Sequence, residues 1–220
     1  MNFLINKFVK EIEILKRRVN DDYFTINCNC KEIANQKMEQ KFEKDLEMVI
    51  HYDKDIDCDQ IVDEAIDFGV EEYRILKLMN YRNIANWICS AIELWEQQLY
   101  LYLRDIKSDV SLKDNWFNTM LNNLDNHYNN VIKSSNQYLN LENKRTLVNI
   151  LKHGEIQSIE KLKQVEPKYF KITSLIEDID GIDLYNSSLT DVSLNINESD
   201  FNETCDQIIK FWEYIITLNN

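Results

Sequence analysis

Apolar residues recur every three or four positions over most of the chain, which is the spacing of one face of an α-helix. The clearest run covers about residues 70–107, where this spacing continues without a break. At about 1.5 Å per residue, a helix of this length would span roughly 55 Å, so we predict that it is the central element of the fold. Its apolar members are Ile84, Ile88, Ala91, Ile92, Trp95, Leu99, Tyr102, Leu103 and Ile106.

The same spacing predicts shorter helices on both sides of this run. They cover residues 1–20, 31–51, 59–68, 139–153, 158–164 and 198–218, and one more begins at residue 116. Asp59 is expected to begin the helix over residues 59–68, and Gly69 to end it. Gly154 is expected to end the helix over residues 139–153. Ser158 and Ser199 are the expected N-caps of the last two helices.

Glycine and proline are scarce, with three and one in 220 residues. This is too few for the many tight turns of a β-sandwich or a parallel α/β fold. Short alternating pieces near residues 182–196 predict one small two-stranded hairpin. We therefore predict an all-α helical bundle built around the long helix. Residues 1–68 are expected to form an N-terminal helical segment that packs on a core of residues 69–220.

The composition is that of a globular protein, with 44% hydrophobic and 29% charged residues. The formal net charge of −13 disfavours binding to nucleic acid, whose phosphates are recognised largely by lysine and arginine. No uninterrupted run of about 18 apolar residues occurs, and charged residues appear early in the sequence. We therefore expect a cytoplasmic protein that has no membrane partner.

The cysteines give no sign of a metal site. They stand at positions 28, 30, 58, 89 and 205, so their number is odd and no C-x-x-C pair is present. Cys28 and Cys30 are too close together for a usual structural zinc pair. The sequence also lacks a glycine-rich phosphate loop. We therefore expect neither a metal ion nor a cofactor.

Arg145, Asn149 and His153 stand four residues apart in the helix predicted before Gly154. On an ideal helix they lie at about 0°, 40° and 80°, so they share one face. One interpretation is the solvated face of an amphipathic helix, with His153 favoured near the helix C-terminus. The other is a site in which His153 transfers protons, Arg145 holds a phosphate and Asn149 orients either group.

The segment "VNILKHG" resembles the signature helix of the HEPN superfamily. These are small α-helical domains, many of them metal-independent ribonucleases of toxin–antitoxin and anti-phage systems. Their pattern is an arginine, then a polar residue, then a histidine four residues after the polar one. Asn149 and His153 match this pattern, Val148 stands at the arginine position, and Arg145 lies one turn earlier.

Three landmarks occur in an order that resembles a family of uncharacterised bacterial α-helical proteins. They are W-E-Q in the long helix, N-x-x-K-H-G at residues 149–154, and F-W-E in the last helix. This resemblance covers about the last two thirds of the chain and implies no established activity.

Two functions remain open from the sequence. The first is a non-enzymatic or degenerate HEPN-like module that acts through protein–protein interaction in a bacterial conflict system, either toxin–antitoxin, anti-phage or anti-defence. The acidic charge and Val148 favour it. The alternative is a HEPN-type ribonuclease toxin with catalytic residues His153, Asn149 and Arg145.

Each function implies its own partners. The first implies a protein partner or a homodimer, and RNA is a partner only in the alternative. For the ribonuclease, two helices crossing antiparallel at Asn149 would bring Arg145 of one chain opposite His153 of the other, so a homodimer is expected.

Overall fold

The computed structural model describes residues 2–24, 29–52, 58–106, 116–154, 156–170 and 194–220. Within these ranges the fold is all-α, as predicted, and contains no strand. The α-helices are α1 (Asn2–Val19), α3 (Cys30–Tyr52), α4 (Cys58–Ile106), α5 (Trp116–His127), α6 (Asn136–His153), α7 (Ile156–Val165) and α9 (Glu198–Leu218). Two shorter elements are the π-helix η1 (Asn20–Phe24) and the 3-10 helix η2 (Pro167–Phe170).

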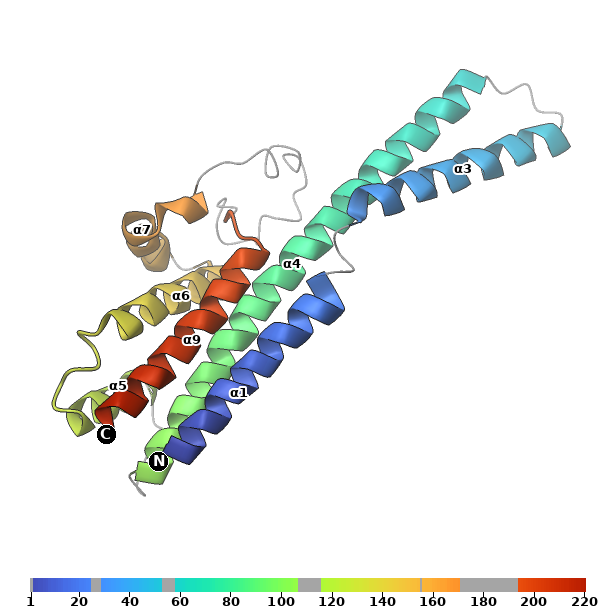
Figure 1. The fold of residues 1–220 in the computed structure, drawn as a ribbon. Helices are drawn as coiled ribbons and strands as arrows, with labels where there is room; N and C mark the ends of the chain where they lie inside the picture. The colour runs from blue at the N-terminus through green and yellow to red at the C-terminus, as the bar shows by residue number, and fades with distance from the viewer. Residues whose placement is uncertain (1, 25–28, 53–57, 107–115, 155, 171–193) are drawn as a thin grey trace.

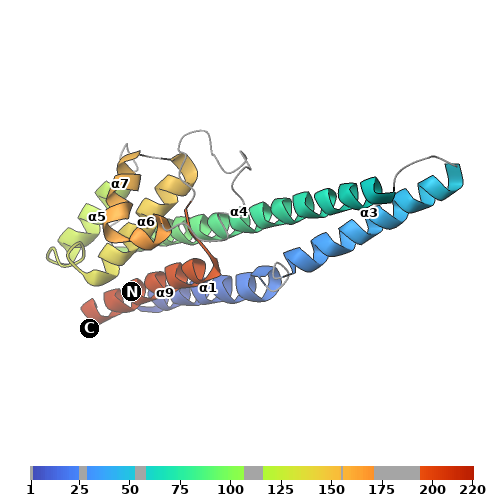
Figure 2. The same cartoon turned by 90° about the horizontal axis from the view of Figure 1, so that it is seen from above.

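The long helix α4 is the central element of a helical bundle (Figure 1). Its C-terminal half contacts α1, α5, α6 and α9, while its N-terminal half extends beyond the bundle beside α3. Figure 2 shows from a second direction that this helix pair projects away from the other helices. We call α3 together with residues 58–80 of α4 the arm. The two chain termini lie at the opposite end of the molecule.

The prediction that Gly69 ends a helix and that the long helix covers only 70–107 is wrong, because α4 runs through Gly69 from Cys58 to Ile106. Gly69 is buried, and a Cβ placed there would lie 2.9 Å from the Cβ of Met38 on α3. The glycine therefore lets the two arm helices approach closely instead of stopping the helix. The predicted boundary between residues 68 and 69 falls inside α4, which both predicted parts share.

The core lies where α1, α4 and α9 meet. Trp95 and Trp212 are completely buried, and Phe211 contacts both of their rings, with centroids 5.5 and 5.3 Å away. Burying a large apolar side chain contributes about 1.5–3 kcal/mol, so this cluster is a main source of stability. Gln98 is buried beside it and accepts a hydrogen bond from the Trp212 indole at 2.9 Å. The amide of Gln98 also donates to the Phe8 carbonyl on α1 at 3.2 Å, which joins the three helices.

The helix ends confirm one predicted cap and correct two. Gly154 has φ 58° and its N–H donates to the Ile150 carbonyl, so it ends α6 as predicted. Ser158 lies inside α7 and is buried, because that helix begins two residues earlier. Asn197, rather than Ser199, caps α9, since the Asn197 side chain accepts from the Ser199 N–H at 2.8 Å.

The hairpin predicted near residues 182–196 lies almost entirely outside the described residues. Its last part, from residue 194, is described and is not a strand. There the N–H of Asn195 donates to the Tyr169 carbonyl at 2.7 Å, which attaches the segment before α9 to η2.

Candidate functional site

The polar face of α6 is turned toward α4. The Nε atom of Arg145 lies 2.7 Å from Oε1 of Glu96, and its guanidinium lies 3.8 Å from the centroid of the Phe117 ring. The two charged side chains are only 31% and 16% exposed. Such a charge-assisted, partly buried pair is stronger than an ordinary surface contact. Arg145 is therefore held by its own chain.

A second pair continues this contact toward the end of α6. Lys152 makes an ion pair with Glu93, which lies one turn before Glu96 on α4. The nearby thiol of Cys89 has its pKa raised to about 11, mainly by burial; Lys152 lowers this value and Glu93 raises it. A thiol with so high a pKa is a poor nucleophile at neutral pH.

The other two residues of the predicted site stand apart from Arg145. Asn149 is partly buried one turn further along α6, and His153 is exposed as the last residue of that helix. Eight residues of helix separate His153 from Arg145, about 12 Å along the axis. The structure thus places all three residues on one helix but does not bring Arg145 and His153 together within one chain.

This geometry determines what the face can do chemically. The exposed imidazole of His153 is accessible to a proton donor or acceptor in solution. Arg145 and Lys152, the cations on this face of α6, are each paired with a glutamate of α4. A phosphate group would have to compete with both carboxylates, so the face is poorly suited to hold one.

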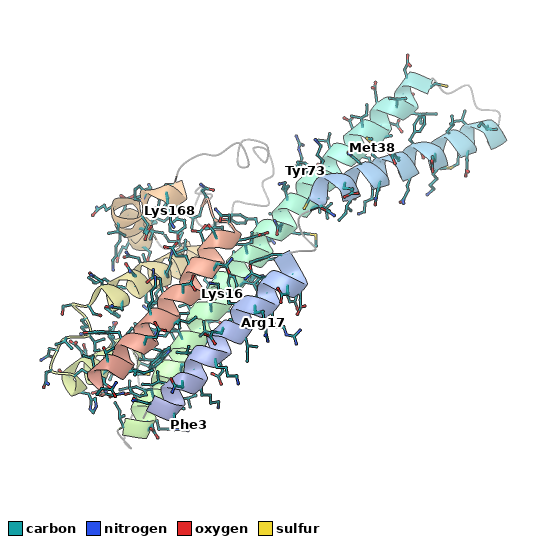
Figure 3. The ribbon with its side chains drawn as sticks, viewed as in Figure 1. Phe3, Lys16, Arg17, Met38, Tyr73 and Lys168 are labelled. Carbon is teal, nitrogen blue, oxygen red and sulfur yellow. The ribbon has the colours of Figure 1, made fainter. Side chains whose placement is uncertain are left out.

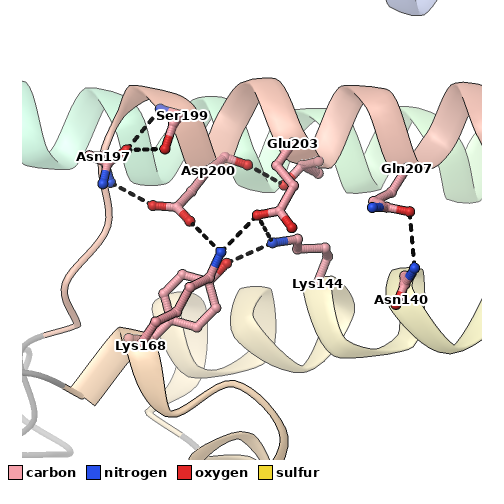
Figure 4. A network of polar contacts seen from close by, with 10 residues as sticks. Asn140, Lys144, Lys168, Asn197, Ser199, Asp200, Glu203 and Gln207 are labelled. Atoms are coloured by element: carbon pink, nitrogen blue, oxygen red, sulfur yellow. Dashed lines mark hydrogen bonds and ion pairs between the residues drawn. The ribbon is translucent and has the colours of Figure 1, made fainter.

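A buried network that the sequence analysis missed lies on the other side of α6 (Figure 4). Lys144 is only 1% exposed, and its ammonium donates to the Tyr169 hydroxyl at 2.7 Å and to Glu203 at 2.8 Å. A signal was present in the sequence. Lys144 stands three residues after Leu141 and four before Val148, on the apolar face of its helix.

Lys168 on η2 completes this network. Its Nζ atom lies 2.8 Å from Glu203 and 3.3 Å from Asp200, both on α9. Partial burial acts to raise the pKa of Glu203, but the hydrogen bonds and charges of Lys144 and Lys168 outweigh it and lower the pKa. Two cations and two carboxylates thus compensate one another, and the network joins α6, η2 and α9. Its role is to hold these elements together.

Within the described ranges, no group of three or more histidine, cysteine, aspartate or glutamate side chains is arranged to bind a metal ion. Among the described helices, none combines the length and the apolar character needed to cross a bilayer.

Comparisons of the chain with family models, with curated proteins and with solved structures find no match.

Proposed function

We propose that this chain is a non-catalytic, degenerate HEPN-like helical module that acts through contact with a protein partner. The observation that carries this proposal is the pairing of Arg145 with Glu96 at 2.7 Å, beneath the Phe117 ring. In the ribonuclease alternative this guanidinium would hold the scissile phosphate. In this chain it is already bound to a carboxylate.

The electrostatics support the same choice. Releasing Arg145 would forfeit a hydrogen bond between charged groups, which contributes about 1.5–3 kcal/mol. The released Glu96 and the nearby Glu93 would then repel a polyanion, in a chain whose formal net charge is already −13. RNA is therefore a poor ligand for this face.

The homodimer of the ribonuclease alternative faces the same obstacle. Crossing two α6 helices at Asn149 would require Arg145 to leave Glu96 and turn toward His153 of the second chain. We therefore propose that contacts with a partner are made elsewhere on the molecule.

The proposed setting is a bacterial toxin–antitoxin, anti-phage or anti-defence system, in the cytoplasm. It is supported by the resemblance of residues 148–154 to the HEPN signature and by the order of the three landmarks. Trp95, Phe211 and Trp212 of these landmarks are completely buried. Core formation accounts for them without any catalytic role.

The test is an RNA cleavage assay in EDTA with the purified full chain, His153→Ala and Glu96→Gln. We expect none of the three to cleave total RNA faster than buffer alone. Glu93→Gln is the matched control, because it removes a neighbouring carboxylate and leaves the Arg145 pair intact. Cleavage by the unmodified chain that His153→Ala abolishes would overturn the proposal in favour of the ribonuclease.

A further inference from the structure

The arm has almost no core of its own. In α3, a helix of 23 residues, only Cys30 and Ala34 are buried among the described side chains. On α4, Ile61, Ala65 and Gly69 face α3 and are buried. Helices are stabilised in proteins chiefly by burying one apolar face, and two helices alone bury little. The two arm helices are joined by an ion pair between Lys37 and Glu72, but they bury few apolar side chains for so long a helix pair.

An apolar stripe on α4 remains uncovered beside α3. Val62, Ile66 and Val70 follow one another at four-residue spacing, and they are 40%, 47% and 45% exposed. Tyr73 continues the stripe. Figure 3 shows Tyr73 and, on α3, Met38 in the arm, away from the bundle.

The stripe borders a hollow between the two helices. Its volume is about 350 Å³, and its walls include Ala34 and Met38 from α3 and Ile66, Gly69 and Val70 from α4. A hollow of this size, lined largely by apolar side chains, has room for an apolar side chain of another helix.

Charges are segregated along the same part of α4. Residues 58–72 contain six aspartates and glutamates and no lysine or arginine, whereas residues 73–82 contain three lysines and arginines and no acidic residue. Asp59, Ile66, Val70 and Lys77 follow steps of seven, four and seven residues, the spacing of a coiled-coil seam. The stripe is thus acidic at one end and basic at the other.

From these observations we infer that the arm binds the arm of a second copy of this chain. The two α4 helices run antiparallel and cross at the level of residue 68, which makes a twofold-symmetric bundle of four helices from two arms. Charge complementarity selects this occupant, because an antiparallel copy brings the acidic end of each stripe to the basic end of the other.

The register follows from the residue numbers. Ile66 and Val70 both lie two residues from the crossing. Ile66 of one copy therefore meets Val70 of the other copy above the hollow, and Val70 meets Ile66. Asp59 and Lys77 both lie nine residues from it, so each Asp59 comes opposite Lys77 of the second copy. Asp63 similarly comes near Arg74 of that copy.

Sedimentation equilibrium of the full chain tests the association. We expect a dimer, and we expect Val70→Glu to be monomeric because it places a charge in the hollow of the second copy. Met79→Glu is the matched control. Met79 is an exposed apolar residue of α4 that lies off the stripe, and its replacement should leave the dimer intact. Circular dichroism checks that each variant keeps its helices.

A charge exchange tests the register and the identity of the partner. Asp59→Lys and Lys77→Glu each place two like-charged pairs in their own dimer, so each should raise the dimer Kd about tenfold or more. An equimolar mixture of the two variants restores both opposite-charge pairs in the mixed dimer. We expect this mixture to associate about as tightly as the unmodified chain.

Three results would overturn the inference. The first is that the unmodified chain stays monomeric at about 100 μM, far above the micromolar Kd of weak interfaces. The second is that Val70→Glu leaves the dimer intact. The third is that the mixture of Asp59→Lys and Lys77→Glu associates no better than either variant alone. A dimer indifferent to Val70→Glu would be joined elsewhere, for example through α6. The inference goes beyond the proposed function, since RNA cleavage at His153 would leave the arm experiments unaffected.

Discussion

The indole N–H of Trp212 donates to the side-chain oxygen of Gln98 across the interface of α9 and α4. Both side chains are almost completely buried, at 0% and 1% exposure. The same Gln98 amide reaches Phe8 and, at 3.2 Å, Glu11 on α1. One uncharged side chain therefore satisfies polar groups of two other helices at the centre of the bundle.

Gln98→Leu should lower the free energy of unfolding by about 1–3 kcal/mol, because it leaves the Trp212 N–H buried without an acceptor. Urea denaturation followed by tryptophan fluorescence measures the change. Gln97→Leu is the control, since Gln97 is exposed on the same helix and its replacement should have little effect. Equal effects of the two substitutions would contradict the importance of this hydrogen bond.

Lys144→Met should destabilise the chain by about 1.5–3 kcal/mol, because it removes the charge-assisted hydrogen bond to Glu203 and the hydrogen bond to the buried Tyr169 hydroxyl. Thermal or urea unfolding gives the value. Lys161→Met removes an exposed ion pair with Glu142 and should cost at most about 1 kcal/mol. The network would be energetically unimportant if both variants unfolded alike.

The lowered pKa of Glu203 predicts a loss of stability in acid. Its pKa in the folded chain lies below the ordinary value of 4.5, so its contribution is complete above about pH 4.5. The contribution then disappears as the pH falls through the lower folded-state pKa. Glu203→Gln should therefore flatten the fall in the urea midpoint below pH 4.5. Glu160→Gln, at an exposed surface pair, should leave that fall unchanged.

Buried cysteines should be alkylated more slowly than exposed ones. Burial raises the pKa of Cys89 to about 11 and that of Cys205 to about 12, whereas Cys58 is exposed. At pH 8 the Cys89 thiolate would be about one part in a thousand, so iodoacetamide should label Cys58 before Cys89 and Cys205. Peptide mass spectrometry at timed intervals measures the order. Rapid labelling of Cys89 at pH 8 would show that its thiolate is more accessible and more stable than the structure indicates.

The helices were predictable because each of them has a continuous apolar face in sequence. The extent of α4 was not, because Gly69 carries a strong local signal for a helix end. Only the approach of Met38, 31 positions away in sequence, shows that the glycine serves close contact between helices. The cap at Ser158 was misplaced because α7 already begins at Ile156. The cap at Ser199 was misplaced because Asn197, two residues earlier, has the extended backbone of a cap and accepts from the Ser199 N–H.

The candidate site illustrates a different limit. Spacing along α6 correctly placed Arg145, Asn149 and His153 on one face, as helix geometry requires. The partner of Arg145 is Glu96, 49 residues earlier, and no pattern within α6 indicates it. A helical wheel shows which residues share a face but does not show which neighbouring helix that face meets.

The unbroken course of α4 has a mechanical consequence. At about 1.5 Å per residue its 49 residues measure roughly 70 Å, and no hinge interrupts them between the tip and the tryptophan cluster. A second copy bound along the arm would therefore be held at a set distance and orientation from the tryptophan cluster. The helix would serve as a stiff spacer, and its length would determine how far apart two tethered bodies stand.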